Sequence, residues 1–336
     1  MAERPPLISP EELPGPGELP RYRVERYLGA DNAVSLSELP EEDAERLRRL
    51  YYLLKETLET ANVAVRDDRP EWMLRGLRDS SFVDTVRGFA EGFSTEGLED
   101  EELRRRLRTV YHDARGGALN AAVGMAQLLE LKGNEVELPD VYGVFNAVRD
   151  HLKILRNCFL DLDPERRRRD TEMNAHSARL FRQKWAGYHD GGVEIDYISD
   201  FEGDISSSCL EFSSVERAIY NLVNNAMQHS PDGFLRLYVK TVDEEEPAQD
   251  VKIATANRLS AEEERTLRDR FGDALGELFM GGFSIGGSGL GLSICTELVS
   301  NAYGLTRLHD AIDGGYVGAA ILREQFVAWI HWPTLQ

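Results

Sequence analysis

Residues 216–233 read ERAIYNLVNNAMQHSPDG, and this stretch does most to decide how the rest of the chain is interpreted. Its apolar residues recur at helical spacing, so we expect a helix. Three asparagines, Asn221, Asn224 and Asn225, oppose that propensity, because asparagine is a poor helix former. Asn221 and Asn225 are four residues apart and therefore share one face. Their amide oxygens are hard ligands that suit Mg²⁺, and a polar helix surface or cap is the alternative explanation.

A second unusual stretch lies at residues 286–294 and reads GGSGLGLSI. Gly287, Gly289 and Gly291 alternate with small and aliphatic residues, and an apolar run follows directly. Glycine occurs in any tight turn. The pattern alone therefore allows either a plain turn into a helix or a backbone cradle for a phosphate.

The clearest predicted helix covers residues 100–132 and contains His112. His112 is two residues from both Val110 and Ala114, which belong to the apolar side, so we expect the imidazole to face solvent. Asp113 follows it, and a carboxylate beside an imidazole can hold one ring nitrogen and leave the other nucleophilic. A surface histidine beside a solvated carboxylate is the alternative. The apolar or small residues of this side are Leu103, Leu107, Val110, Ala114, Gly117, Ala121, Met125 and Leu128.

A second apolar stripe follows after a predicted break at Gly133–Asn134. The two stripes predict a helical hairpin that cannot bury both apolar faces by itself. Pairing two copies into a four-helix bundle would bury them, so we expect a homodimer. The second stripe consists of Val141, Val144, Val148, Leu152, Leu155, Phe159 and Leu162.

The composition narrows the possible partners and the compartment. A formal net charge of −20 on 336 residues disfavours nucleic-acid binding. The basic run Arg166–Arg169 is more typical of a helix end or linker than of a DNA contact. Cys158, Cys209 and Cys295 are far apart in the sequence, which favours reduced thiols in a cytoplasmic protein. No apolar run has the length of a membrane span.

The distribution of helix-like and strand-like segments along the chain predicts an α+β protein of four parts. We expect a disordered tail over 1–20, a mostly helical region of unknown role over 21–98, the hairpin over 99–166 and a mixed domain over 172–336. In the last part, strand-like segments surround the asparagine helix. These segments are VEIDYIS (193–199), FLRLYVKTV (234–242), VKIATAN (251–257) and AAILREQFVAWIHW (319–332).

Taken together, these motifs resemble two-component sensor histidine kinases. NLVNNAMQHSPDG resembles the N box of their Bergerat-type ATP-binding domain, which is an α/β sandwich, and GGSGLGLSI resembles the G2 box. LFMGGF (278–283) is similar to a phenylalanine-containing segment before the G2 box, and YHDARGGALNAA is similar to the phosphoacceptor H box. The resemblance covers roughly residues 105–332. The first hundred residues lie outside it.

The resemblance implies an autokinase that binds ATP and Mg²⁺ and passes its phosphoryl group to an aspartate of a response-regulator receiver domain. It makes His112 the phosphoacceptor and Asp113 its orienting partner. It also implies that the G2 glycines approach the nucleotide phosphates. The implied nucleotide-binding positions are Asn221, Asn225, Asn257, Gly287, Gly289, Leu290 and Gly291, with Asn225 and Asn221 on the metal.

The sequence departs from the family pattern at two places. Asn257 stands where the family has the aspartate that accepts from the adenine amino group, and an amide oxygen can accept the same bond without charge. Leu259 and Ala261 replace glycines of that motif. Gly116 and Gly117 follow His112 where the family commonly has Asn or Thr, then Pro. They predict weak phosphatase activity and a helix weakened by roughly 1 kcal/mol per glycine.

Two other functions remain open on the sequence. The altered segment 257–261 would suit a histidine phosphotransferase or pseudokinase that keeps the phosphoacceptor but does not use ATP. A Bergerat-type switch that binds a protein partner and phosphorylates serine is the other. The hairpin that carries His112 and Asp113 argues against this second alternative.

Overall fold

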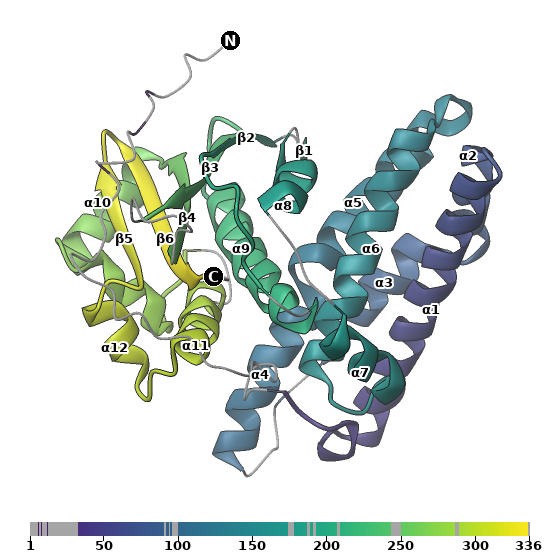
Figure 1. Cartoon of the computed structure of the whole chain (residues 1–336), viewed down its shortest axis with the longest axis horizontal. Helices are drawn as coiled ribbons and strands as arrows, with labels where there is room; N and C mark the ends of the chain where they lie inside the picture. Colours follow the sequence, from purple (N-terminus) through teal and green to yellow (C-terminus); the bar gives the residue numbers. More distant parts are fainter. Residues whose placement is uncertain are drawn as a thin grey trace. The chain divides into compact units, whose positions relative to one another are not determined.

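The chain forms two compact units, Asp31–Asp170 and Met1–Ala30 with Thr171–Gln336. We call them the helical unit and the sheet unit (Figure 1). The computed structural model describes Pro6, Ile8, Glu12 and residues 33–334, with gaps inside that range. The gaps are 91, 94, 96–99, 174–177, 187–188, 191–192, 207–208, 243–249 and 286–288.

The helical unit is built around the hairpin of α5 and α6, with α1 packed along α6 and with α2 and α3 packed on α5. Helices α1 to α3, from the N-terminal region of the same chain, therefore bury part of the apolar surface of the hairpin. Whether a second copy covers the rest stays a prediction. The helices are α1 (Glu41–Arg66), α2 (Pro70–Asp79), α3 (Phe82–Ala90), α4 (Glu101–Arg115), α5 (Gly117–Lys132), α6 (Leu138–Cys158) and α7 (Pro164–Glu172).

The single helix expected over 100–132 is in fact two, because the backbone breaks at Gly116. Gly116 is extended, with φ −99° and ψ −168°, and it ends α4 and begins α5. The two adjacent glycines lower the helix propensity enough for tertiary packing to redirect the chain there. The predicted break at Gly133 is confirmed, since this residue ends α5 with a φ of +58°.

The sheet unit contains a mixed sheet of six strands in the order β1-β2-β3-β4-β6-β5. Among the described strands, β2 and β3 pair in parallel and the other neighbouring strands pair antiparallel. The last predicted strand segment is a hairpin, which turns at Arg323–Glu324 with positive φ at both residues. The strands are β1 (His189–Asp190), β2 (Val193–Ser199), β3 (Phe234–Thr241), β4 (Asp250–Arg258), β5 (Val317–Leu322) and β6 (Gln325–Pro333).

Helix α9 carries the three asparagines and is the central helix of the sheet unit. It packs against α11 and against β3 and β4, and nearly all of its side chains up to Val223 are buried. This mixture of packed helices and sheet confirms the predicted α+β class. The helices are α8 (Ala178–Trp185), α9 (Cys209–Gln228), α10 (Ala261–Phe271), α11 (Gly291–Tyr303) and α12 (Leu308–Asp313), with a 3₁₀ segment η4 at Leu275–Met280.

The predicted disordered tail over 1–20 lies mostly outside the described residues. Pro6, Ile8 and Glu12 are described, and all three contact the sheet unit, which differs from the expectation at these positions. Ile8 is only 2% exposed because it packs among apolar side chains of the sheet.

Three further expectations concern the surface and the thiols. In the part of the chain that the structure describes, no helix is long and apolar enough to cross a membrane. The basic run Arg166–Arg169 lies inside α7. Two of its guanidinium groups form ion pairs within that helix, Arg166 with Asp170 and Arg169 with Glu165. All three cysteines are buried free thiols.

Candidate functional site

The start of α11 lies directly against the asparagine face of α9. The Asn221 side chain is buried, and its Nδ2 donates to the Arg217 carbonyl at 3.0 Å. A Cβ added at Gly291 would lie 3.5 Å from Asn221 Oδ1. The Cys295 thiol joins the same helices one turn further on, donating to the Ala218 carbonyl at 3.4 Å. The structure therefore brings together two motifs that are about seventy residues apart. Asn225, one turn after Asn221, is half-buried.

The glycine segment bends sharply before α11 begins. Gly289 has a φ of +69°, and an added Cβ would come within 2.8 Å of the Phe283 carbonyl oxygen. Leu290 caps α11, which starts at Gly291. A side chain at 289 would be strained both by the backbone conformation and by this contact. Gly287 lies outside the described residues.

Asn257 is held in one orientation at the end of β4. Its Nδ2 donates to two backbone carbonyls, that of His229 at 2.7 Å and that of Arg258 at 2.9 Å. Because both neighbours are acceptors, the nitrogen of the amide must face them. The Oδ1 atom is buried and has no hydrogen-bond partner among the described residues. The site thus contains one unsatisfied neutral acceptor, which suits an N–H donor of a ligand.

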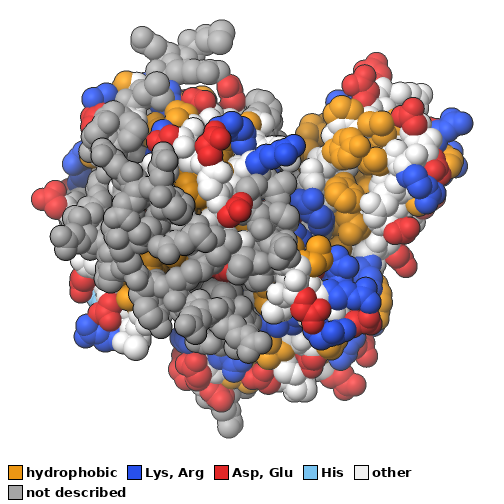
Figure 2. Space-filling model, viewed as in Figure 1, with side chains coloured by type: hydrophobic (Ala, Val, Ile, Leu, Met, Phe, Trp, Pro, Cys, Tyr) orange, Lys and Arg blue, Asp and Glu red, His pale blue; other side chains and the backbone are white. Residues whose placement is uncertain are grey.

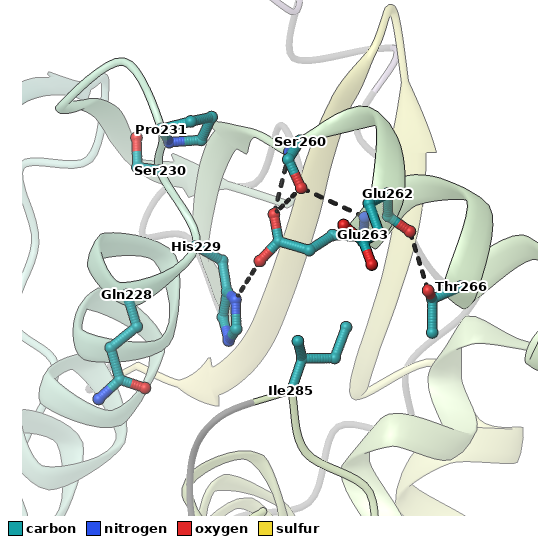
Figure 3. Close-up of a pocket in the computed structure, with 9 residues that line it drawn as sticks. All are labelled: Gln228, His229, Ser230, Pro231, Ser260, Glu262, Glu263, Thr266 and Ile285. Carbon is teal, nitrogen blue, oxygen red and sulfur yellow. Dashed lines mark hydrogen bonds and ion pairs between the residues drawn. The ribbon is translucent and has the colours of Figure 1, made fainter.

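A cavity of about 480 Å³ lies between the end of α9 and the start of α10 (Figure 3). From α10, Glu263 reaches across to His229, whose Nδ1 is 2.7 Å from Glu263 Oε1. Glu263 also forms the capping box of α10 with Ser260. Burial raises the pKa of Glu263, and its hydrogen bonds to Ser260 and His229 outweigh that effect, so the pKa is lowered overall. Ile285 forms another part of the cavity lining.

Sequence reasoning did not single out His229 or Glu263. The pattern Ser-x-x-Glu at 260–263 is a signal for a helix start, and it could have predicted the capping box. Nothing in the sequence pairs Glu263 with His229, because that contact joins the ends of two separate helices.

His112 and Asp113 lie in the helical unit, near the end of α4. The His112 Nδ1 is 3.4 Å from Asp113 Oδ1. The expectation of a solvent-facing imidazole is only partly met, since the His112 side chain is 22% exposed and that of Asp113 is 4% exposed. Asp113 is therefore not a solvated helix-face charge. Next to the pair, the buried Tyr111 hydroxyl donates to Asp43 of α1 at 2.7 Å, which anchors this turn of α4.

The sequence analysis also missed His151 of α6, which is completely buried in the same unit. Burial lowers the pKa of its imidazole to about 3, while the backbone of Ala114 and the charge of Asp113 act in the opposite direction. Among the residues that the structure describes, neither ring nitrogen of His151 has a hydrogen-bond partner. His151 is thus a neutral imidazole at neutral pH, and Asp113 is close enough to act on its titration. Its signal in the sequence is weak, because a histidine next to an apolar stripe is commonly a core residue.

The structure gathers part of the predicted nucleotide site and does not test the rest. Asn221 and Gly291 are neighbours, and Asn257 contacts the backbone of the cavity residue His229. Asn225 and Leu290 belong to the same two helix segments. Within the described ranges, no three His, Cys, Asp or Glu side chains gather in a way that could hold a metal ion.

No protein-family model matches the sequence, and no curated protein matches it. Several solved structures are similar to parts of the chain. The catalytic domain of histidine kinase ThkA aligns over 46% of this chain and 88% of its own, with 19% identity and a TM-score of 0.29. The mycobacterial sensor histidine kinase MprB aligns over 46% of this chain and 88% of its own, with 19% identity and a TM-score of 0.28. The blue-light activated histidine kinase of Erythrobacter litoralis aligns over 73% of this chain and 63% of its own, with 14% identity and a TM-score of 0.32. These three proteins are histidine kinases. With TM-scores this low, the functional proposal rests on the chain's own residues.

Proposed function

We propose that this chain is a histidine kinase that transfers the γ-phosphoryl group of ATP to His112 and then to a response-regulator aspartate. The observation that carries the proposal is the packing of the start of α11 on the asparagine helix α9, where a Cβ added at Gly291 would lie 3.5 Å from Asn221 Oδ1. A plain turn into a helix would not explain the asparagines on the facing side of α9. A phosphate with its cation would use the glycine-rich segment and the asparagines together, because backbone amides bind the anion and side-chain amide oxygens bind the metal.

The nucleotide would be held by residues of the sheet unit. The Oδ1 of Asn257 would accept from the adenine amino group, and the backbone at Gly289, Leu290 and Gly291, with Gly287, would approach the phosphates. Asn225 and Asn221 would provide amide oxygens to Mg²⁺. The cation would neutralise phosphate charge and orient the transferred group. These residues fit such a ligand, since Asn257 offers a buried acceptor without a partner among the described residues and Gly291 leaves room beside Asn221.

At the acceptor, Asp113 would hold the proton on Nδ1 of His112 and leave the lone pair of Nε2 free to attack. The bond between Nε2 and the γ-phosphorus forms as the bond from that phosphorus to the bridging oxygen breaks, and ADP leaves. The positive charge that develops on the imidazole is stabilised by the buried carboxylate. Catalysis would consist mainly of positioning and charge neutralisation, so the approach of the two units would control the rate.

The partners follow from the same proposal. A receiver-domain aspartate would take the phosphoryl group from His112, and the chain would act in the cytoplasm as a homodimer. Apolar side chains gather over the α5–α6 hairpin (Figure 2) and support a second copy there: Leu128 is 47% exposed, Leu131 84% and Tyr142 46%. We expect Leu131→Asp to shift the mass measured by light scattering from dimer to monomer. Gly116, which has no side chain to position water, fits the proposed weak phosphatase activity.

The test is incubation of the purified chain with γ-labelled ATP and Mg²⁺, beside His112→Ala and Asn225→Ala. We expect a label on the protein that is lost in acid, kept in alkali and absent from both variants. Asn224→Ala is the matched control, because Asn224 is the neighbouring asparagine outside the proposed metal set, and its label should stay within about twofold of the unchanged chain. An acid-stable label would instead indicate phosphoserine and the partner-switch alternative.

A second candidate function is a histidine phosphotransferase that does not use ATP. It is favoured by the altered segment 257–261, where Asn257, Leu259 and Ala261 stand in place of the aspartate and glycines of the motif that the segment resembles. In that case calorimetry would detect no ATP binding. His112 would still accept a phosphoryl group from a phosphorylated receiver domain, and His112→Ala would abolish that transfer.

A further inference from the structure

One face of the sheet carries an apolar cluster that contains no residue of α9 or α11. The cluster consists of Tyr238, Ala254, Ala256, Val327 and Trp329, with Ile198, Ala320 and Leu322 at its edge, and Ile8 completes it. Side chains alternate along a strand, so Ala254 and Ala256 lie on the face opposite to Asn257. This face is therefore separate from the candidate nucleotide site.

Ile8 is seated in this cluster by both its side chain and its backbone. Its side chain is 2% exposed, and its N–H donates to the Tyr238 hydroxyl at 3.3 Å. Burial raises the pKa of Tyr238, so the hydroxyl stays neutral and available as an acceptor at neutral pH. An apolar side chain and one backbone donor of the N-terminal segment thus both have partners on the sheet.

Polar groups of the sheet fix the residues on either side of Ile8. Arg236 and Gln325 both donate to the Pro6 carbonyl, each at 3.0 Å, and both of these sheet side chains are buried. At the other end, Arg323 in the β5–β6 turn pairs with Glu12 at 2.6 Å. Two buried donors from different strands that meet on one carbonyl show the chemistry of a peptide site, because a buried donor needs an acceptor.

We propose that this face of the sheet is a docking site for an extended peptide and that its occupant is the chain's own N-terminal segment around Pro6, Ile8 and Glu12. The site recognises a carbonyl before an aliphatic residue and an acidic residue four positions after it. Proline suits the first position because it has no N–H that would need a partner. An uncovered apolar face of this kind would otherwise be exposed to solvent.

A competing peptide with the same pattern of carbonyl, aliphatic and acidic groups would displace Ile8 from the cluster. The inference does not depend on the proposed kinase function, since no residue of the nucleotide or phosphoacceptor site takes part.

Hydrogen–deuterium exchange of the full chain tests the proposal at the Ile8 amide. We expect this amide to exchange roughly tenfold or more slowly than in the free peptide, because its hydrogen bond is broken only when the segment undocks. Ile8→Asp should bring the amide of residue 8 to the free-peptide rate, while Ile8→Val should keep it protected. Tyr238→Phe removes the acceptor and should speed exchange at Ile8 with little change elsewhere on the sheet.

Two results would overturn the proposal. Exchange of Ile8 at the free-peptide rate in the unchanged chain would mean that the segment is not docked. Protection that disappears on dilution would mean that the occupant comes from a second copy and not from the same chain. Amide exchange is read without ATP, so either result is distinguishable from a failure of the kinase proposal.

Discussion

The two units differ in how their candidate residues come together. In the helical unit, His112 and Asp113 are adjacent in sequence, and the candidate pair exists wherever α4 forms. In the sheet unit, Asn221 of α9 and Gly291 of α11 become neighbours only when the two helices pack, and Asn257 of β4 reaches the His229 carbonyl only in the folded unit. Two adjacent residues of one helix stay close however the rest of the chain folds. A site built from several elements also depends on how each side chain is oriented after packing. The Asn257 amide is the sharpest example of that dependence.

The largest expected effect tests the orientation of Asn257. Asn257→Asp introduces the aspartate of the motif that this segment resembles, yet we expect it to destabilise this protein by about 3 kcal/mol. The new carboxylate would be buried and would face the His229 and Arg258 carbonyls, which repel it. The free energy of unfolding in urea at neutral pH measures this loss.

The control for this variant is Asn257→Ala, which leaves two carbonyls without their donor but adds no charge. Its loss should be smaller, about 2 kcal/mol. The loss in Asn257→Asp should shrink as the pH falls, because a protonated carboxyl can donate to one carbonyl. An aspartate variant as stable as the unchanged chain would show that the amide is not held in this orientation.

The next effect tests whether His151 is a neutral core residue of the helical unit. The unfolded imidazole takes up a proton below about pH 6.5, while the folded one does so only near pH 3. The unfolded state therefore binds more protons in that window, and stability is full above pH 6.5 and falls with acid. Between pH 7 and pH 5 we expect His151→Leu to remove about 2 kcal/mol of this loss. The unfolding free energy at both pH values measures it.

His331 of the sheet unit provides the internal reference for that experiment. It is also buried with a lowered pKa, and it stays in place in the His151→Leu variant. Acid sensitivity should therefore decrease but not disappear. An unchanged dependence of stability on pH would mean that His151 is not protected from protons in the folded state.

A smaller effect concerns the break between α4 and α5. A Cβ at Gly116 would lie 2.9 Å from the His112 carbonyl oxygen, so Gly116→Ala cannot keep the extended backbone without a shift. We expect a net loss of about 1 kcal/mol, because this contact outweighs the gain in helix propensity. Thermal unfolding followed by circular dichroism measures it. Added helix signal with greater stability would instead mean that glycine alone causes the break.

The smallest effect concerns the ion pair across the cavity. Glu263→Gln removes the charge that faces His229 but keeps a side chain able to complete the capping box with Ser260. The pair is largely buried but lies at the cavity edge, so we expect a loss of about 0.5 kcal/mol. Glu262→Gln, on the exposed neighbouring residue, should change stability less. Chemical denaturation of both variants compares them, and equal losses would mean that the pair contributes nothing.

The sequence by itself determined several helices and strands and the local chemistry at His112 and Asp113. Alternation fixed the strands near Val193–Ser199 and Phe234–Thr241, helical spacing fixed α9, and the adjacent His112 and Asp113 needed no long-range information. These features depend on neighbours a few residues apart, which a sequence displays directly.

Only the tertiary structure decided the contacts between distant residues. It set the helix break at Gly116 and the packing of α1 to α3 on the hairpin. It also set the hydrogen bonds of the Asn257 amide to two carbonyls, the burial of His151 and the packing of Ile8 on the sheet. Each of these depends on which surfaces pack together. Burial and hydrogen-bond satisfaction are properties of the whole folded unit, and no local pattern encodes them.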